Sequence, residues 1–270
     1  MQNPVSFHHF RKIFKNQKRV MAVLMLFGFI LELLITIILS TSVMRNFLEG
    51  YFKLLPPAVK HLTGFLGQNF AGSQFIAFGY NHPAILFALI FISVSIASRY
   101  ITAEIEHRSI ELLALRLFPR YKIIVTQYVF IVFMIFMIFL GMFCGTVAGK
   151  HFTNMTSEIN VIMISKIIGT GILFFSAIGA IVTFIATKTN ERGLALAWSI
   201  GVLLFLFVYD AIIRLWEQAD FLKPYSLFNW YQPVNIATKN YNFIVGITLL
   251  VFLNVFFLSM AIRSFKKRDL

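Results

Sequence analysis

Long apolar runs separated by short polar segments dominate the chain, and each of six runs is long enough for a helix to cross the hydrocarbon core of a bilayer. No repeat of 20–50 residues is visible. The pattern predicts an all-α polytopic membrane protein with a single transmembrane domain over residues 1–270. We expect the spans at about 20–43, 83–101, 123–148, 164–186, 194–213 and 243–262.

Three other segments are mixed in polarity. Residues 1–19 carry five basic and no acidic side chains, and Phe7, Phe10 and Phe14 share one helical face, which is typical of an interfacial helix on an anionic leaflet. A plain basic flank that only orients the first span explains this segment equally well. We expect one or two short helices at the outer surface in 44–82. Residues 214–242 are too polar to span and predict a broken or re-entrant segment between the last two spans.

Residues 103–120, AEIEHRSIELLALRLFPR, form a charged stretch between the second and third spans. The stretch holds three carboxylates, three guanidinium groups and one histidine. Helical spacing gives it one charged face and one partly apolar face, so it predicts a short amphipathic helix outside the hydrocarbon. Pro119 ends that helix near Leu117 or Phe118, because the residue before a proline disfavours helical geometry.

Charge sets the predicted orientation. Only 13% of the residues are charged, against about a quarter in soluble domains, and the formal charge is +13. Sixteen lysines and arginines fall at the termini, in the 99–122 loop and in the 188–192 turn, and eight fall on the other side. The positive-inside rule therefore places both termini in the cytoplasm. The basic balance is explained by membrane orientation, without nucleic acid.

The charged stretch resembles the signature of ABC-2-type transporter permeases. Those proteins usually read A-x-E-x-x-x-G-T-x-E-x-L-L-x-x-P-x-S-R at this loop, and here the sequence runs A-E-I-E, then S-I-E-L-L, then Arg120. Six spans, a basic N-terminus, a sizeable outer loop with Pro56-Pro57 and a broken segment before the last span extend the resemblance to the whole chain. It is most similar to the branch that contains nitrous-oxide-reductase maturation permeases.

The resemblance implies a transport subunit of a bacterial inner membrane, and an exporter. Two copies of the chain, or one copy and a paralogue, would work with two copies of a separate ATPase subunit, which would carry the ATP and magnesium. The 103–120 stretch would be the coupling helix that docks on the ATPase. Its expected contact residues are Glu104, Glu106, Arg108, Glu111, Arg116 and Arg120.

The chain departs from the family pattern at two positions. Arg108 stands where the family usually has glycine, and Leu117 stands where it usually has proline. A membrane anchor or scaffold that recruits a cytoplasmic partner without transport is the alternative, and the acidic loop would serve it equally well. The three glutamates favour a partner, because lysine and arginine alone suffice to orient a loop. The substrate is not indicated.

Few polar side chains lie within the predicted spans. Glu32 is the one acid deep in a span, where a charge costs on the order of 2.5–3.5 kcal/mol on insertion scales. It could line a translocation path or serve as a structural carboxyl within the bundle, and both readings stay open. Ser93, Ser95 and Asn254 are further candidates for the path, but hydrogen bonds between helices explain them more simply.

Small and aromatic residues suggest packing roles. Gly141, Gly145 and Gly149 form a small-xxx-small ridge for close approach of another helix, in this chain or in a second copy. Asp210 and Arg214 are one helical turn apart, which predicts a surface pair. The aromatic residues of the broken segment suggest a belt at the outer interface; they are Trp216, Trp230 and Tyr231.

Catalytic and metal motifs are weak. The six histidines show no i, i+4 pairing with one another, and they have no flanking acids suited to zinc. The single cysteine, Cys144, rules out an internal disulfide. The glycines of GTVAGKH at 145–151 have the wrong spacing for a phosphate-binding loop. We therefore expect no enzyme, no metal and no cofactor on this chain.

Overall fold

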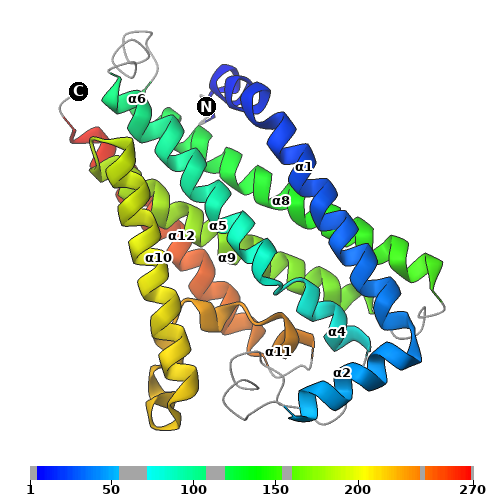
Figure 1. The fold of residues 1–270 in the computed structure, drawn as a ribbon. Helices are drawn as coiled ribbons and strands as arrows, with labels where there is room; N and C mark the ends of the chain where they lie inside the picture. The colour runs from blue at the N-terminus through cyan, green and yellow to red at the C-terminus, as the bar shows by residue number, and fades with distance from the viewer. Residues whose placement is uncertain (1–4, 55–71, 108–118, 154–159, 238–240, 269–270) are drawn as a thin grey trace.

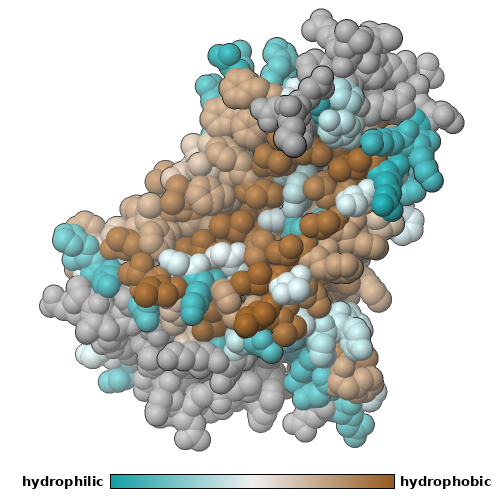
Figure 2. All heavy atoms as spheres, turned by 180° about the vertical axis from the view of Figure 1, so that it is seen from behind, coloured by the Kyte–Doolittle hydropathy of each residue, from teal (hydrophilic) through white to brown (hydrophobic). Residues whose placement is uncertain are grey.

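The computed structural model describes residues 5–54, 72–107, 119–153, 160–237 and 241–268. Within these ranges the chain is helical and contains no strand. Among the described residues, six helical segments are long and apolar enough to cross a membrane: 7–40, 76–106, 121–152, 161–188, 192–215 and 243–266. The prediction of an all-α polytopic membrane protein is confirmed at this level. Figure 2 shows apolar residues gathered over the middle of one face and polar residues towards its ends.

The first span is one continuous helix, α1 (Phe7–Ser40). It has no break near residue 20, because no proline or glycine occurs between Phe7, where the helix begins, and Gly28. The apolar face of its first turns packs against other helices of the chain. The rings of Phe10 and Phe130 meet edge to face at 5.2 Å, and the backbone N–H of Ser6 donates to Thr126 Oγ1 at 2.9 Å. The N-terminal segment therefore packs on the bundle.

A helical segment with one break forms the second span. After α2 (Ser42–Leu54), the structure describes α4 (Gly72–Gly79) and then α5 (Pro83–Ala97). Pro83 begins α5 at the predicted position, because a proline tolerates the first helical turn. A π-helical turn, η1 (Ser98–Thr102), leads into α6 (Ala103–Glu106). The second span therefore extends over residues 76–106, from α4 to the base of the charged stretch, and is broken at residues 80–82.

The remaining spans are regular and end close to the predicted positions. They are α8 (Arg120–Phe152), α9 (Val161–Lys188), α10 (Arg192–Leu215) and α12 (Phe243–Lys266). The side chain of Asn160 caps α9 by accepting from the N–H groups of Ile162 and Met163. Between α10 and α12 lie two 3₁₀ helices and one short α-helix: η2 (Glu217–Tyr225), η3 (Phe228–Trp230) and α11 (Pro233–Ala237).

The core centres on α9, which is the most buried span, and α12 and α10 lie at the periphery. α9 packs against α12, α8 and α5, and α1 packs along α8. Both termini and α6 lie at one end of the bundle, and α2, α4 and α11 lie at the other (Figure 1). We call these the terminal end and the far end.

Candidate functional site

At the terminal end, the base of the charged stretch is tied to α1. Lys12 Nζ lies 3.4 Å from Glu104 Oε1. The Glu104 side chain is only 12% exposed, whereas that of Lys12 is 52% exposed. Partial burial strengthens such a pair, because the surrounding protein screens the charges less than water does. Glu104 was expected to contact a partner, and the structure shows that it contacts the N-terminal helix of its own chain.

A second bond ties the charged stretch to α10. Glu106 Oε2 accepts a hydrogen bond from the backbone N–H of Arg192 at 2.9 Å. Arg192 is the first residue of α10, and the side chain of the N-cap residue Glu191 makes no capping bond. Glu106 therefore acts as a cap from a distant segment, and its negative charge sits at the positive end of the helix dipole.

The π-helical turn joins the second span to the fourth. Thr102 Oγ1 donates to the carbonyl oxygen of Ala186 at 3.0 Å. Arg268 Nη1 donates to the carbonyl oxygen of Thr187 at 2.7 Å, so the C-terminal tail reaches the same end of α9. π-helical turns within longer helices are frequent at functional sites. The charged stretch therefore begins where the second span, the end of the fourth span and the C-terminal tail are held together.

The other expected contact residues fall largely outside the described ranges. Arg108, Glu111 and Arg116 belong to residues 108–118, which the structure does not describe. Arg120 is the first residue of α8. The prediction that these residues contact a partner stays a prediction.

The glycine ridge of α8 lies against α1 of the same chain. A Cβ atom on Gly141 would come within 2.4 Å of the carbonyl oxygen of Met25, and one on Gly145 within 2.3 Å of that of Phe29. A Cβ on Gly149 would meet the Thr36 side chain at 2.5 Å. Only glycine permits this approach of the two backbones. In this structure, α1 of the same chain therefore packs on the ridge.

Glu32 is fully buried where α1, α8 and α4 meet. Its Oε2 accepts from Thr146 Oγ1 at 3.3 Å, and the Thr146 hydroxyl is 3.0 Å from that of Tyr80. Gly79 makes room for the carboxyl, because a Cβ there would lie 2.3 Å from Glu32 Oε1. No described residue gives Oε1 a hydrogen-bond partner. The carboxyl is therefore part of a buried polar network and does not project into the lipid.

The other polar candidates within the spans make helix contacts. Asn254 Nδ2 donates to the carbonyl oxygen of Leu173 at 3.0 Å, and its Oδ1 accepts from the Tyr128 hydroxyl. It therefore joins α12 to α9 and α8. Ser93 bonds within its own helix, to the carbonyl oxygen of Leu89 at 2.8 Å. The carbonyl oxygen of Ser95 accepts from Ser98 Oγ at 3.2 Å.

At the far end, Asp210 and Arg214 form a pair that is not at the surface. Arg214 Nε donates to Asp210 Oδ2 at 2.6 Å, and Asp210 is only 7% exposed. Ser226 Oγ also donates to the Asp210 carboxylate, and Arg214 Nη2 donates to the carbonyl oxygen of Phe228 at 3.3 Å. The prediction of a surface pair is wrong, because the broken segment folds back over the last turns of α10 and covers both side chains.

Tyr231 anchors the broken segment to the second span. It is buried, and it therefore does not belong to the expected interfacial belt. Its hydroxyl donates to the carbonyl oxygen of Tyr80 at 2.9 Å, which the break between α4 and α5 frees from helix bonding. Burial raises the pKa of Tyr231 well above its usual value, so the hydroxyl keeps its proton and remains a donor.

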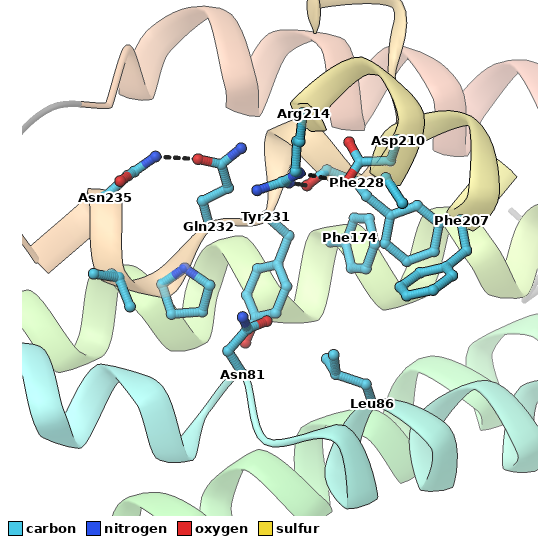
Figure 3. Close-up of a pocket in the computed structure, with 13 residues that line it drawn as sticks. Asn81, Leu86, Phe174, Phe207, Asp210, Arg214, Phe228, Tyr231, Gln232 and Asn235 are labelled. Carbon is cyan, nitrogen blue, oxygen red and sulfur yellow. Dashed lines mark hydrogen bonds and ion pairs between the residues drawn. The ribbon is translucent and has the colours of Figure 1, made fainter. Parts of the chain in front are cut away.

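A pocket of about 300 Å³ lies at this end, between α5, α9, α10 and residues 228–235. Figure 3 shows an aromatic wall on one side, and Arg214, Gln232 and Asn235 on the other. Phe174 and Tyr231 stack with ring centroids 5.1 Å apart, and Phe228 meets Phe174 edge to face at 5.4 Å. The pocket therefore combines a rigid apolar surface with hydrogen-bonding groups.

Two further observations bear on the chemistry of the site. No group of three or more histidine, cysteine, aspartate or glutamate side chains in the described parts of the chain is placed to hold a metal ion. The comparison with protein-family models gave no match, and the comparison with curated proteins gave none either.

Proposed function

We propose that this chain is the membrane-spanning subunit of an ABC-2-type transporter, an exporter driven by a separate ATPase subunit. The six helices that can cross a membrane support this proposal, as does the resemblance of residues 103–120 to the permease signature. The basic side chains at the terminal end favour a cytoplasmic location for both termini and for the charged stretch. Two such chains, or one with a paralogue, would pair with two ATPase subunits at that end.

The main structural support for the proposal is a pair of bonds at the base of the charged stretch. Glu104 reaches Lys12 of α1, and Glu106 caps α10 at Arg192. A displacement of α6, at residues 103–106, would therefore act on the first and fifth spans as well as on the second. A loop whose only role is orientation needs no such bonds. Closure of the ATPases would move these spans and open a path for the substrate.

The same bonds divide the expected contact residues into two groups. Glu104 and Glu106 would transmit movement within the chain. Direct contact with the ATPase would then fall mainly to the charged residues further along the stretch, such as Glu111. Charge-assisted bonds from such residues are strong when they are partly desolvated in an interface.

Charge reversal tests both roles in the reconstituted complex. The Glu106→Lys, Glu111→Lys double variant should insert normally but lose ATPase association or stimulation. Glu111→Lys alone should weaken association, whereas Glu106→Ala should leave association intact and reduce the stimulation of ATP hydrolysis. If the doubly reversed protein binds the ATPase and stimulates hydrolysis as the wild type does, the coupling assignment is wrong. Association without any ATP-dependent response in the wild type would favour the scaffold alternative.

A further inference from the structure

The far-end pocket is large enough for part of an amphiphilic ligand. Its volume of about 300 Å³ lies at the lower end of the range for small-molecule sites. It can take a compact head and a short stretch of chain, but not a whole amphiphile.

The polar side of the pocket offers hydrogen-bond donors, and the charge of its arginine, Arg214, is balanced by the Asp210 carboxylate. Arg214 uses Nε for Asp210 and Nη2 for the carbonyl oxygen of Phe228. No described residue accepts a hydrogen bond from its Nη1, and Arg214 lines the pocket. Asn81, at the break between α4 and α5, lines it from the opposite element. A guanidinium group with a free edge is suited to phosphate oxygens.

The pocket also reaches the surface that faces lipid. Phe207 of α10 lines the pocket and is 51% exposed. Arg214 lies in the last turn of α10, and the next residue after that helix, Trp216, is exposed, as are Phe221 and Tyr225. Exposed aromatic residues next to a helix end mark the depth of the lipid headgroups. The arginine therefore sits where a phosphate group of the membrane would be found.

We propose that the far-end pocket binds one phospholipid of the adjacent leaflet, with its phosphate on Arg214 and the start of an acyl chain along the wall formed by Phe174, Phe207 and Phe228. Lipid enters from the side, past Phe207. The proposal requires that the chain spans a membrane, but it does not require an ATPase partner, so it stands or falls separately from the transporter assignment. Under the positive-inside orientation, this leaflet is the outer one.

The test uses the full chain in detergent, with short-chain phosphatidylglycerol as the probe and native mass spectrometry as the readout. Ala211→Phe fills the pocket while Asp210 and Arg214 themselves stay unchanged, because Ala211 also lines it. Leu204→Phe is the matched control, since Leu204 is exposed on the same helix and does not line the pocket. We expect one lipid per wild-type chain, binding at least about tenfold weaker in Ala211→Phe and unchanged in Leu204→Phe.

Two further arms separate the role of the phosphate from that of the chain. The wild type should prefer phosphatidylglycerol to diacylglycerol, and Arg214→Lys, which keeps the charge but loses the planar fork, should reduce that preference. Glycerol phosphate at the same concentration should not displace the lipid. Equal binding to Ala211→Phe and wild type would overturn the pocket as the site. Displacement by glycerol phosphate would assign the site to a soluble anion. If Ala211→Phe fails to fold, Phe207→Trp narrows the entrance and is expected to weaken binding in the same way.

Discussion

Glu106 Oε2 accepts a hydrogen bond from the backbone N–H of Arg192 at 2.9 Å, although the two residues are 86 positions apart. The bond joins the last residue of α6 to the first residue of α10. It connects the end of the second span to the start of the fifth at the terminal end. This contact ties the base of the charged stretch to the bundle.

Removing this cap should loosen the start of α10. Glu106→Ala should cost about 0.5–2 kcal/mol of local stability, in the range of helix caps, and Glu106→Gln should cost less because an acceptor remains. Faster hydrogen exchange of the first-turn amides of α10 would report the loss. Glu191→Ala is the matched control, since the Glu191 side chain makes no capping bond. Equal exchange in Glu106→Ala and Glu191→Ala would contradict the capping role.

Substitution by alanine should destabilise the protein at a glycine of the ridge, but not at a glycine whose surroundings are open. Gly145→Ala should force α1 and α8 apart, because the new Cβ would lie 2.3 Å from the carbonyl oxygen of Phe29. Overpacking of this kind costs typically 1–3 kcal/mol. Gly201→Ala meets nothing within 4 Å and should be neutral or stabilising by up to about 1 kcal/mol. Thermal unfolding in the same detergent compares them, and equal melting temperatures would argue against the close approach.

Glu32 and Gly79 should be coupled energetically. Gly79→Ala places a Cβ against the Glu32 carboxyl, so it should destabilise the wild type and do less harm in a Glu32→Ala background. A double-mutant cycle should give a coupling energy within the range of about 0.5–3 kcal/mol observed for residues in contact. Additive effects would mean that the carboxyl does not occupy the space beside Gly79. Glu32→Gln retains an acceptor for Thr146 and should fold normally.

The Asp210–Arg214 pair should hold the broken segment in place. Asp210→Ala leaves the arginine charge without its buried partner, which typically costs 3–5 kcal/mol. The double variant Asp210→Asn, Arg214→Gln should recover part of this loss. Hydrogen exchange over residues 217–231 is the measurement. The exposed pair Asp220–Lys223 is the control, since breaking a surface ion pair costs about 0–1 kcal/mol. A mild effect of Asp210→Ala would contradict the anchoring role.

The spans could be predicted because the length of an uninterrupted apolar run indicates the length of the helix that it forms. The helices differ from the expected ranges by a few residues, except where α1 continues back to Phe7 and the second span continues on either side of its predicted limits. Both differences arise at the ends of apolar runs, where the sequence offers no strong stop signal. Periodicity in a single segment also cannot show which neighbour covers an apolar face, as Phe10 on Phe130 illustrates.

The partners of the polar residues could not be predicted. Glu32 stands out in the sequence as a lone acid, but Thr146 lies 114 residues further on and carries no local signal. The i, i+4 spacing of Asp210 and Arg214 revealed their bond but not their burial, which depends on Ser226 and the carbonyl of Phe228 returning over α10. Tyr231 was likewise predicted at the interface because its contact with Tyr80, in a distant segment, leaves no signal in the local sequence. Contacts between distant segments decide these roles, and a one-dimensional pattern does not contain them.

If this chain is the membrane subunit of an ATP-driven transporter, the intact mass of its complex should include ATPase chains. The tagged chain would be purified in mild detergent after co-expression with its neighbouring genes, and native mass spectrometry would give the stoichiometry. We expect two such chains, or one and a paralogue, together with two ATPase chains. A complex of this chain alone, or with a partner that lacks a nucleotide-binding motif, would show that the chain is not the membrane subunit of such a transporter.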